Sequence, residues 1–316
     1  MSDLILETRD LVKYFDTNNG KVHAVDHVDL GIPAGGTLGV VGESGCGKST
    51  LGRCVVNLLP VTSGQIMYNG KDIHGKDVKR KELCQHMQMI FQDPYSSLDP
   101  RKSVFNLIAE PLRANHLCSR AEMQERVDEI MNTVGLAPEL AGSYPHELDG
   151  GRRQRIGVAR ALITNPSFIV CDEPVSALDV SIQAQILNLM MDVQEQREVT
   201  YMFITHDLSV VKHISQTIAV MYLGQVVEQA PTKELFAHPL HPYTVALLDA
   251  LPVPDASHRR MKRTLIKGEV SSPINPAPGC RFAGRCPYAK AACTSSDIPL
   301  VEVGNGHMVR CLYPQE

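Results

Sequence analysis

The stretch "GESGCGKST" contains residue types whose spacing could bind a phosphate. From Gly42 to Ser49 it reads G-x-x-x-x-G-K-[ST], the pattern of a glycine-rich loop that opens a helix. In such a loop backbone N–H groups surround a β-phosphate, Lys48 reaches the β- and γ-phosphates, and Ser49 offers a hydroxyl to magnesium. The spacing predicts a nucleoside triphosphate site, with a chance glycine turn as the alternative. The predicted nucleotide contacts are Gly42, Glu43, Ser44, Gly45, Cys46, Gly47, Lys48, Ser49 and Thr50.

A second stretch, "SFIVCDEP" at residues 167–174, ends an apolar run with two carboxylates. The run is typical of a strand buried on both faces of a sheet. At its end we expect Asp172 to hold magnesium through water and Glu173 to lie beside the attacking water as a general base. Adjacent acids at a strand end can also form an ordinary turn. The glycine loop in the same chain favours the catalytic interpretation.

Four cysteines crowd the end of the chain: Cys280, Cys286, Cys293 and Cys311, separated by five, six and 17 residues. Their segment is rich in proline and weakly apolar, so it needs a cross-link or a metal to fold. Disulfides fit poorly with a cytoplasmic protein. A four-cysteine Zn²⁺ site usually presents C-x2-C pairs, which this tail lacks. A four-iron four-sulfur cluster is larger and tolerates wider, irregular spacing.

The elements that must position these residues can be read from apolar periodicity. "VHAVDHVDLGI" alternates as a half-buried strand does, "GTLGVV" is apolar throughout as a parallel strand is, and "LGRCVVNLL" has helical spacing. Further on, a helical stripe typical of a core-facing surface comprises Met123, Val127, Ile130, Met131 and Val134. The uneven placing of prolines and cysteines predicts a domain boundary near residues 235 to 250.

Length, charge and composition exclude several classes of protein. The 316 residues suffice for one large α/β domain with an appendage. A net charge of -4 gives no general attraction to nucleic acid. The N-terminus lacks the pattern of a signal peptide, and no apolar run approaches the roughly 20 residues that cross a bilayer. We therefore expect a soluble, cytoplasmic protein whose nine cysteines form no disulfide framework.

Six motifs occur in the order "GESGCGKST", "FQDPYSSLDPR", "LDGGRRQR", "CDEP", "SALD" and "ITHD". Over residues 4–230 they resemble the nucleotide-binding subunit of an ABC transporter. The resemblance implies an α/β P-loop NTPase with a RecA-like parallel sheet, an antiparallel N-terminal sheet and a helical signature subdomain at about 96–158. Residues 1–235 would form this nucleotide-binding domain, and residues 236–316 a small cysteine-containing C-terminal domain with a regulatory role.

The resemblance also assigns roles to single residues. Gln92 matches the Q-loop glutamine, which touches magnesium and the attacking water and relays the nucleotide state to the transmembrane partner. His206 matches the switch histidine that contacts the γ-phosphate. Phe15 takes the place of the aromatic residue that stacks on adenine, and Tyr14 is the neighbouring candidate.

Three sets of residues follow from these matches. The catalytic set is Glu173, His206 and Gln92. The magnesium set is Ser49, Gln92 and Asp172. The D-loop, which crosses the interface between two nucleotide-binding subunits, is Ser176, Ala177, Leu178 and Asp179.

The signature motif departs from the usual family pattern L-S-G-G-Q, which lies over the γ-phosphate held by the opposite subunit. Leu148, Gly150 and Gly151 match, whereas Asp149 replaces serine and Arg152 replaces glutamine. A carboxylate about 4 Å from a phosphate charge costs about 4 kcal/mol at an effective dielectric of about 20. Arg152 lies three residues further on a nearby helical face, so we expect the two to form a charge-compensated signature that still closes on ATP.

Four further stretches, "FQDPYSSLDPR", "HDLSVV", "VMYLGQVVE" and "HPLHPYTVALLDALP", resemble the oligopeptide, dipeptide and nickel importer branch, especially its second ATPase subunit. This implies ATP hydrolysis coupled to peptide import at the cytoplasmic face of the membrane, where the subunit is peripheral. The implied partners are a second ABC ATPase subunit in a heterodimer, two transmembrane permease subunits and, indirectly, an extracytoplasmic substrate-binding protein.

Two alternatives remain open. The same machinery could import nickel or a metal-opine complex. A soluble ABC ATPase that acts on DNA or ribosomes usually has a second nucleotide-binding domain, a coiled-coil insertion or basic arms, and this sequence has none, so we expect no nucleic-acid partner.

The branch also bears on the cysteine tail. C-terminal cysteine clusters in peptide-importer ATPases of this type are associated with 4Fe-4S centres, so the resemblance favours a 4Fe-4S cluster over Zn²⁺ at Cys280, Cys286, Cys293 and Cys311. Its role would be structural or regulatory, because ATP hydrolysis needs no electron transfer. His238 and His241 each stand beside a proline, which favours a structured turn over a metal site.

Overall fold

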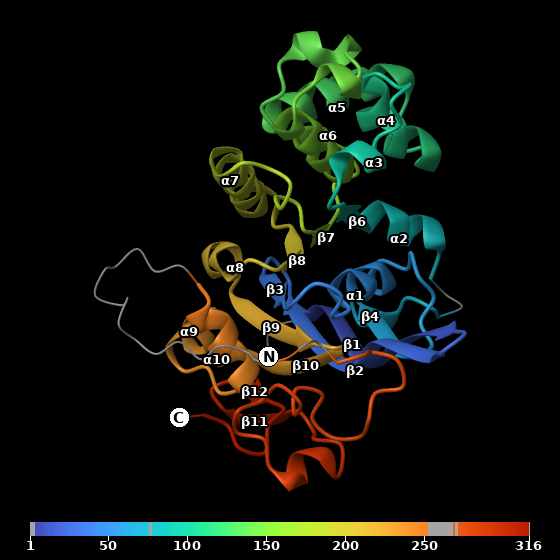
Figure 1. The fold of residues 1–316 in the computed structure, drawn as a ribbon. Coiled ribbons are helices and arrows are strands. Elements are labelled where there is room, and N and C mark those ends of the chain that lie inside the picture. The colour runs from blue at the N-terminus through green and yellow to red at the C-terminus, as the bar shows by residue number, and fades with distance from the viewer. Residues whose placement is uncertain (1–3, 76–77, 252–267, 269–270, 316) are drawn as a thin grey trace. The chain divides into compact units, whose positions relative to one another are not determined.

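The computed structural model describes residues 4–75, 78–251, 268 and 271–315 (Figure 1). Within them the chain divides into two compact units. The first unit contains the stretches up to Leu6, Gly31–Gly36 and Met67–Ile204. The second unit contains Glu7–Leu30, Thr37–Ile66 and Thr205–Glu316. The C-terminal residues therefore cluster with the glycine loop, and the boundary predicted near residue 235 does not coincide with this division.

In the second unit, strands of a mixed sheet follow the order β11-β12-β10-β9-β3. β3 (Thr37–Val41) runs parallel to β9 (Thr217–Tyr222), and every residue of β3 is buried, as the uninterrupted apolar run predicted. β10 (Gln225–Pro231) is antiparallel to β9 and to β12 (His307–Val309), which pairs with β11 (Val301–Gly304). The end of the chain is thus part of the sheet that carries the glycine loop.

A smaller sheet in the same unit has the order β2-β1-β4. Its strands are β1 (Leu4–Thr17), β2 (Gly20–Pro33) and β4 (Ser63–Tyr68), whose ends belong to the first unit. The helices of the second unit are α1 (Lys48–Val55), α8 (Leu208–Ile214), α9 (Thr232–Ala237), α10 (Pro242–Asp249) and the 3-10 turn Ala291–Thr294.

The first unit contains three parallel strands in the order β8-β7-β6. They are β6 (Met87–Ile90), β7 (Phe168–Asp172) and β8 (Thr200–Thr205), and the short β5 (Lys71–Asp72) pairs with the end of β4. The helices are α2 (Arg80–His86), α3 (Pro94–Ser97), α4 (Val104–Asn115), α5 (Arg120–Thr133), α6 (Gly150–Leu162) and α7 (Val180–Arg197), with 3-10 turns at Pro138–Gly142 and Pro145–Glu147.

Helices α4, α5 and α6 pack against one another in the region predicted to be helical (Figure 1). Ser119 and Glu122 form a capping box that starts α5. The predicted apolar stripe is buried at all five positions: Met123, Val127, Ile130, Met131 and Val134. The stripe is therefore core rather than a partner surface. Among the described helices none is long and apolar enough to cross a membrane.

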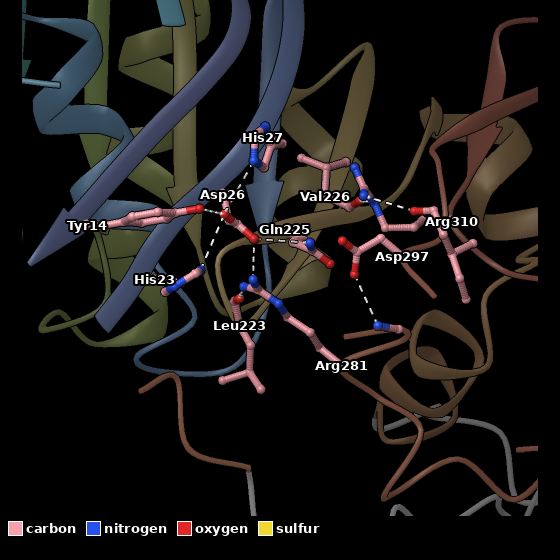
Figure 2. Close-up of polar contacts among 12 residues, drawn as sticks. Tyr14, His23, Asp26, His27, Leu223, Gln225, Val226, Arg281, Asp297 and Arg310 are labelled. Atoms are coloured by element: carbon pink, nitrogen blue, oxygen red, sulfur yellow. Dashed lines mark hydrogen bonds and ion pairs between the residues drawn. The ribbon is translucent and has the colours of Figure 1, made fainter. Parts of the chain in front are cut away.

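A buried ion pair joins the N-terminal sheet to the C-terminal region of the second unit (Figure 2). Asp26 on β2 pairs with Arg281, and both side chains are 6% exposed. The carboxylate of Asp26 also accepts hydrogen bonds from the Tyr14 hydroxyl and, at 3.2 Å, from Gln225 Nε2. Arg281 donates in addition to the carbonyl of Leu223. Each buried charge therefore has a partner, which is the condition for tolerating it.

Two further polar residues fix the C-terminal backbone beside this pair (Figure 2). Arg310 Nε donates to the Val226 carbonyl at 3.0 Å, and Asp297 Oδ1 accepts the N–H of Gly279 at 3.1 Å. The first bond joins the residue before Cys311 to β10, and the second joins the residue before Cys280 to Asp297.

Because removal of one partner leaves an uncompensated buried charge, we expect Asp26→Asn to lower the free energy of unfolding by about 3 kcal/mol. Urea unfolding of the full chain measures this. The matched control is Asp10→Asn, since Asp10 is 68% exposed and pairs with the exposed His27, so the loss there should stay below about 1 kcal/mol. Equal losses in the two variants would contradict a special role for the buried pair.

The effect of Asp26→Asn on the free energy of unfolding should depend on pH, and the direction follows from the pKa of Asp26. Burial raises the pKa of Asp26, but the hydrogen bond from Tyr14 and the charge of Arg281 outweigh it and lower the pKa below the usual value. A lowered pKa means that the stabilisation is complete above the unfolded pKa of about 3.9 and is lost as the pH falls through the folded pKa. The difference between wild type and Asp26→Asn should therefore shrink in strong acid.

Candidate functional site

The glycine loop of the second unit follows β3 directly and ends in α1. Gly42 has φ 153°, and a Cβ there would lie 2.2 Å from the carbonyl oxygen of Met221. Gly47 has φ 106° and precedes α1, and a Cβ there would lie 1.9 Å from the carbonyl oxygen of Ala24. Neither position can hold a side chain without moving backbone. The neighbouring strands thus require the glycines that the motif supplies.

Lys48 is 4% exposed, and its ammonium lies within the loop. Nζ donates to the carbonyl oxygens of Gly42 at 2.8 Å and Glu43 at 3.0 Å. Ser44 and Gly45, at the tip of the loop, are exposed. The structure therefore gathers the lysine and an open turn of backbone at the start of a helix, the arrangement that binds phosphates.

Cys46, in the middle of the loop, is a packing residue. It is 3% exposed, and burial raises the pKa of its thiol. A thiol that stays protonated is a poor nucleophile.

Of the two aromatic candidates for adenine, Phe15 is the more available. Tyr14 stacks on His23 with ring centroids 3.9 Å apart, and its hydroxyl donates to Asp26. Phe15 is 36% exposed, with the Lys13 ammonium 4.7 Å from its ring centroid. Tyr14 already contacts other residues of the protein through its ring and its hydroxyl. Phe15 therefore remains the preferred candidate for stacking on adenine.

The predicted carboxylates lie at the end of β7 in the first unit. Asp172 is 1% exposed and ends the strand. Glu173 follows in the left-handed region with φ 46°, and its N–H donates to the Ile204 carbonyl at 2.9 Å. Gln92 Nε2 donates to Glu173 Oε2 at 2.9 Å. The structure therefore brings together two of the three predicted catalytic residues.

The third, His206, belongs to the second unit. It is exposed and lies between β8 and α8, where Asp207 caps the helix by accepting the N–H of Ser209 at 2.8 Å. The capped helix fixes the backbone next to the histidine.

The signature motif starts α6, and Asp149 is its N-cap. Asp149 Oδ1 accepts the N–H of Arg152 at 2.8 Å, and its Oδ2 lies 3.4 Å from Arg152 Nε. The pairing predicted from helical spacing is present. Aspartate and serine are both strong N-caps, so aspartate keeps the local function of the usual serine. Arg152 then offsets the charge that aspartate adds.

The signature glycines pack closely on the D-loop and on α7 within the first unit. A Cβ on Gly151 would lie 2.9 Å from Ile182 Cγ2, and one on Gly150 would lie 3.4 Å from Leu178 Cδ2. Asp179 caps α7 by accepting the Ile182 N–H at 3.1 Å. A larger residue at Gly151 would have to displace the Ile182 side chain.

The predicted D-loop is also hydrogen-bonded to the backbone of Glu173. Ser176 Oγ donates to the carbonyl of Glu173 at 3.1 Å, and Gln183 Nε2 donates to the carbonyls of Val175 and Leu178, each at 3.0 Å. The predicted D-loop, catalytic and signature residues of the first unit therefore form one packed set.

The four tail cysteines line one small cavity in the second unit, together with His241: Cys280, Cys286, Cys293 and Cys311. The cavity of about 10 Å³ has room for about one water molecule. Burial raises the pKa of Cys280 to about 11 and also raises the pKa values of Cys286 and Cys311. In the described parts of the chain, no three His, Cys, Asp or Glu side chains converge on a point that would suit a single metal ion. Neither the predicted 4Fe-4S cluster nor Zn²⁺ is supported by this arrangement alone.

The histidines of "HPLHPYT" form the structured turn that was predicted. His238 is the C-cap of α9 and His241 the N-cap of α10, where Nδ1 accepts the Tyr243 N–H at 3.1 Å. His241 Nε2 is buried and has no hydrogen-bond partner in the described residues. Sequence reasoning missed that His241 lines the cysteine cavity, because 38 residues separate His241 from Cys280.

Comparisons with known proteins agree with these features. Residues 25–176 match the family described as ABC transporter, and residues 227–293 match the C-terminal region of oligopeptide/dipeptide transporters. The chain is 48% identical to the oligopeptide transport ATP-binding protein AppF of Bacillus subtilis, over 98% of this chain and 97% of the relative. It is 49% identical to OppF of Salmonella typhimurium, over 98% and 96%.

Solved structures share the fold. CbiO1 of Clostridium perfringens, part of the ABC transporter complex CbiONQ, has a TM-score of 0.65 and 29% identity, over 75% of this chain and 92% of that one. The ATP-binding cassette MJ0796, as a dimer bound to ADP and phosphate, has a TM-score of 0.65 and 26% identity, over 72% and 98%. Fold and motifs thus define an ABC transporter ATPase. The chain belongs to the oligopeptide/dipeptide branch of the ABC transporter ATP-binding proteins.

The N-cap explanation of Asp149 can be tested by two substitutions. Asp149→Ser keeps a capping oxygen, so we expect the free energy of unfolding to change by less than about 0.5 kcal/mol, whereas Asp149→Ala should lose about 1 kcal/mol. If Arg152 offsets the charge, ATP-driven dimerisation of Asp149→Ser should stay within about threefold of wild type. Dimerisation far tighter than wild type would show instead that the natural signature is degenerate.

Proposed function

We propose that this chain is the ATP-hydrolysing, energy-coupling subunit of an importer for di- and oligopeptides. One observation carries the substrate class. The two solved cassettes named above cover 75% and 72% of the chain, whereas the oligopeptide transport ATP-binding proteins AppF and OppF cover 98% of it. The remainder includes the C-terminal region that matches oligopeptide/dipeptide transporters. That match also supports a functional boundary near residue 235 between the domains 1–235 and 236–316.

In the second unit the glycine loop would hold the phosphates of ATP. The exposed backbone at Ser44 and Gly45 offers N–H groups, and the Lys48 ammonium, placed by two loop carbonyls, would reach the phosphate oxygens. Magnesium neutralises phosphate charge when it is bound. Its predicted ligands Ser49, Gln92 and Asp172 offer the oxygen atoms that Mg²⁺ prefers.

In the first unit Glu173 would act as the general base, and its hydrogen bond with Gln92 supports this role. Gln92 Nε2 occupies one lone pair of Oε2 and so fixes the direction of the carboxylate. The carboxylate of Glu173 would accept a proton from the attacking water. His206 would contact the γ-phosphate.

Assembly follows from the family. The signature and the D-loop would meet the nucleotide of an opposite subunit, which we propose is a second, different ABC ATPase. Two transmembrane permeases would bind this heterodimer at the cytoplasmic face of the membrane, and an extracytoplasmic binding protein would deliver the peptide. The composite site with this chain's Lys48 and Glu173 would be the faster one, because the other site uses the altered signature. Nickel and metal-opine complexes are the alternative cargo.

Transport by the intact complex tests the function. We expect the chain to co-purify with two permeases, and peptide uptake into vesicles to require ATP. Glu173→Gln should still bind ATP, because size and polarity are kept, but turnover should fall at least about 100-fold. Lys48→Ala should instead weaken ATP binding itself.

Three results would count against this assignment. Glu173→Gln with normal turnover would mean that Glu173 is not the base or that the partner's site carries the reaction. Unchanged ATP affinity in Lys48→Ala would refute the phosphate cradle. A stable complex with ribosomes or DNA in place of permeases would refute import.

We further propose that the cysteine cavity holds a 4Fe-4S cluster, with Zn²⁺ as the alternative. The proposal starts from the donor set: four thiols line one cavity together with His241, whose Nε2 is buried and has no hydrogen-bond partner in the described residues. Four thiolates are the usual ligands of such a cluster. Since the cavity now has room for about one water, binding requires the side chains to move apart. A bound cluster would cross-link a segment that has little apolar core.

Anaerobically purified protein should be brown and contain about four irons per chain. Cys286→Ser should lose the iron, whereas Cys118→Ser, which changes a cysteine of the first unit, should keep it. Colourless anaerobic protein with about one zinc per chain would refute the cluster.

A further inference from the structure

Glu43 is the second residue of the glycine loop. Its carbonyl, its N–H and its carboxylate each contact a different residue. Its carbonyl oxygen accepts from Lys48 Nζ at 3.0 Å. Its N–H donates to the Tyr243 hydroxyl at 2.8 Å. Its carboxylate is held by both terminal nitrogens of Arg285, with Nη1 2.7 Å from Oε2 and Nη2 3.1 Å from Oε1. Glu43 therefore contacts the lysine ammonium and also makes two contacts to the C-terminal region.

The pair between Arg285 and Glu43 has the geometry of a strong ion pair. A guanidinium that donates two parallel hydrogen bonds to one carboxylate fixes both the distance and the direction of that carboxylate. The Arg285 side chain is 9% exposed and that of Glu43 is 27% exposed, so solvent screens the pair only in part. Arg285 Nη1 also lies 3.3 Å from the Tyr222 hydroxyl, which limits its freedom to leave.

A carboxylate in this loop opposes the loop's own chemistry. The backbone N–H groups and Lys48 attract phosphate, whereas an uncompensated Glu43 side chain repels it. Arg285 supplies the compensating charge, and it comes from 242 residues further along the chain.

Aromatic packing holds the Arg285 loop in place. Phe282 is 1% exposed, and its ring centroid lies 5.3 Å from that of Tyr222 and 5.4 Å from that of Tyr243. Phe282 also lines the cysteine cavity, and Cys286 directly follows Arg285. The same short loop therefore faces the cysteines on one side and the glycine loop on the other.

We propose that Arg285 is a positioning residue of the ATP site: it neutralises Glu43 and fixes the backbone carbonyl on which the Lys48 ammonium rests. The C-terminal region would then be part of the nucleotide site rather than an appendage to it. This inference rests on the proposed binding of ATP by the glycine loop. The hydroxyl of Tyr243 is the second contact by which the region holds the same residue.

The test is ATP binding by the full chain, measured by titration calorimetry. Arg285→Gln should raise the Kd for ATP about tenfold, since it leaves the carboxylate of Glu43 unpaired in the loop. Arg285→Lys keeps the charge without the fork and should give a smaller loss. The double variant Glu43→Gln with Arg285→Gln should return to within about threefold of wild type, because the carboxylate is gone. The loss in Arg285→Gln should also shrink at high salt.

A matched control removes one positive charge from the same region. Lys290 is exposed and lies 3.9 Å over the ring of Tyr313, so Lys290→Gln should leave ATP binding unchanged. If Arg285→Gln does not fold, Arg285→Lys and the double variant carry the test.

Two outcomes overturn the proposal: wild-type affinity in Arg285→Gln, or a double variant as weak as Arg285→Gln, which would mean a purely structural role. Failure of the proposed function is separable from both. In that case Lys48→Ala would bind ATP as wild type does. Weak binding by Lys48→Ala with normal binding by Arg285→Gln would refute this inference alone.

Discussion

The close approach of two strands to the glycine loop is the constraint on which the nucleotide site depends. The carbonyl oxygens of Met221 on β9 and Ala24 on β2 occupy the places where a Cβ of Gly42 or Gly47 would stand. Only glycine fits at these two positions, so the two strands restrict which residues the loop can contain where it leads into α1. Lys48 then needs no side-chain partner to stay inside the loop, since two loop carbonyls already hold it.

Charge is the second theme, and it links the C-terminal region to that loop. Two acids, Glu43 in the loop and Asp26 on β2, each pair with an arginine of the cysteine segment, and Figure 2 shows the pair of Asp26 with Arg281. In the sequence Arg281 follows Cys280, and Arg285 precedes Cys286. Both pairs are largely buried, so loss of either partner would leave a charge that water cannot solvate well. A segment with little apolar core is therefore held to the rest of its unit chiefly by polar contacts and by the Phe282 ring.

Short-range features were predictable from the sequence, and long-range partners were not. The strand before Gly42, the strand that ends at Asp172, the buried face of α5 and the pairing of Asp149 with Arg152 all follow from spacings of a few residues, and the structure contains them. The pair between Glu43 and Arg285 spans 242 residues and leaves no periodic trace. Position in a motif predicted a role for Gln92 without predicting that it would donate to Glu173. The predicted cluster also depends on side-chain positions that spacing alone does not determine.

The unusual signature shows how one chain can absorb an unfavourable charge locally. One carboxylate oxygen of Asp149 caps α6, and the other lies 3.4 Å from Arg152 Nε. Both oxygens therefore interact with groups of the helix that Asp149 begins. Both side chains are more than half exposed, at 61% and 53%, so the pair adds little to stability. The pair instead affects the net charge of the motif. Asp149 and Arg152 together have a net charge close to zero, as do the serine and glutamine of the usual pattern. An aspartate in place of the usual serine would by itself repel phosphate. With Arg152 in place of the usual glutamine, it is compatible with an ATP-binding cassette.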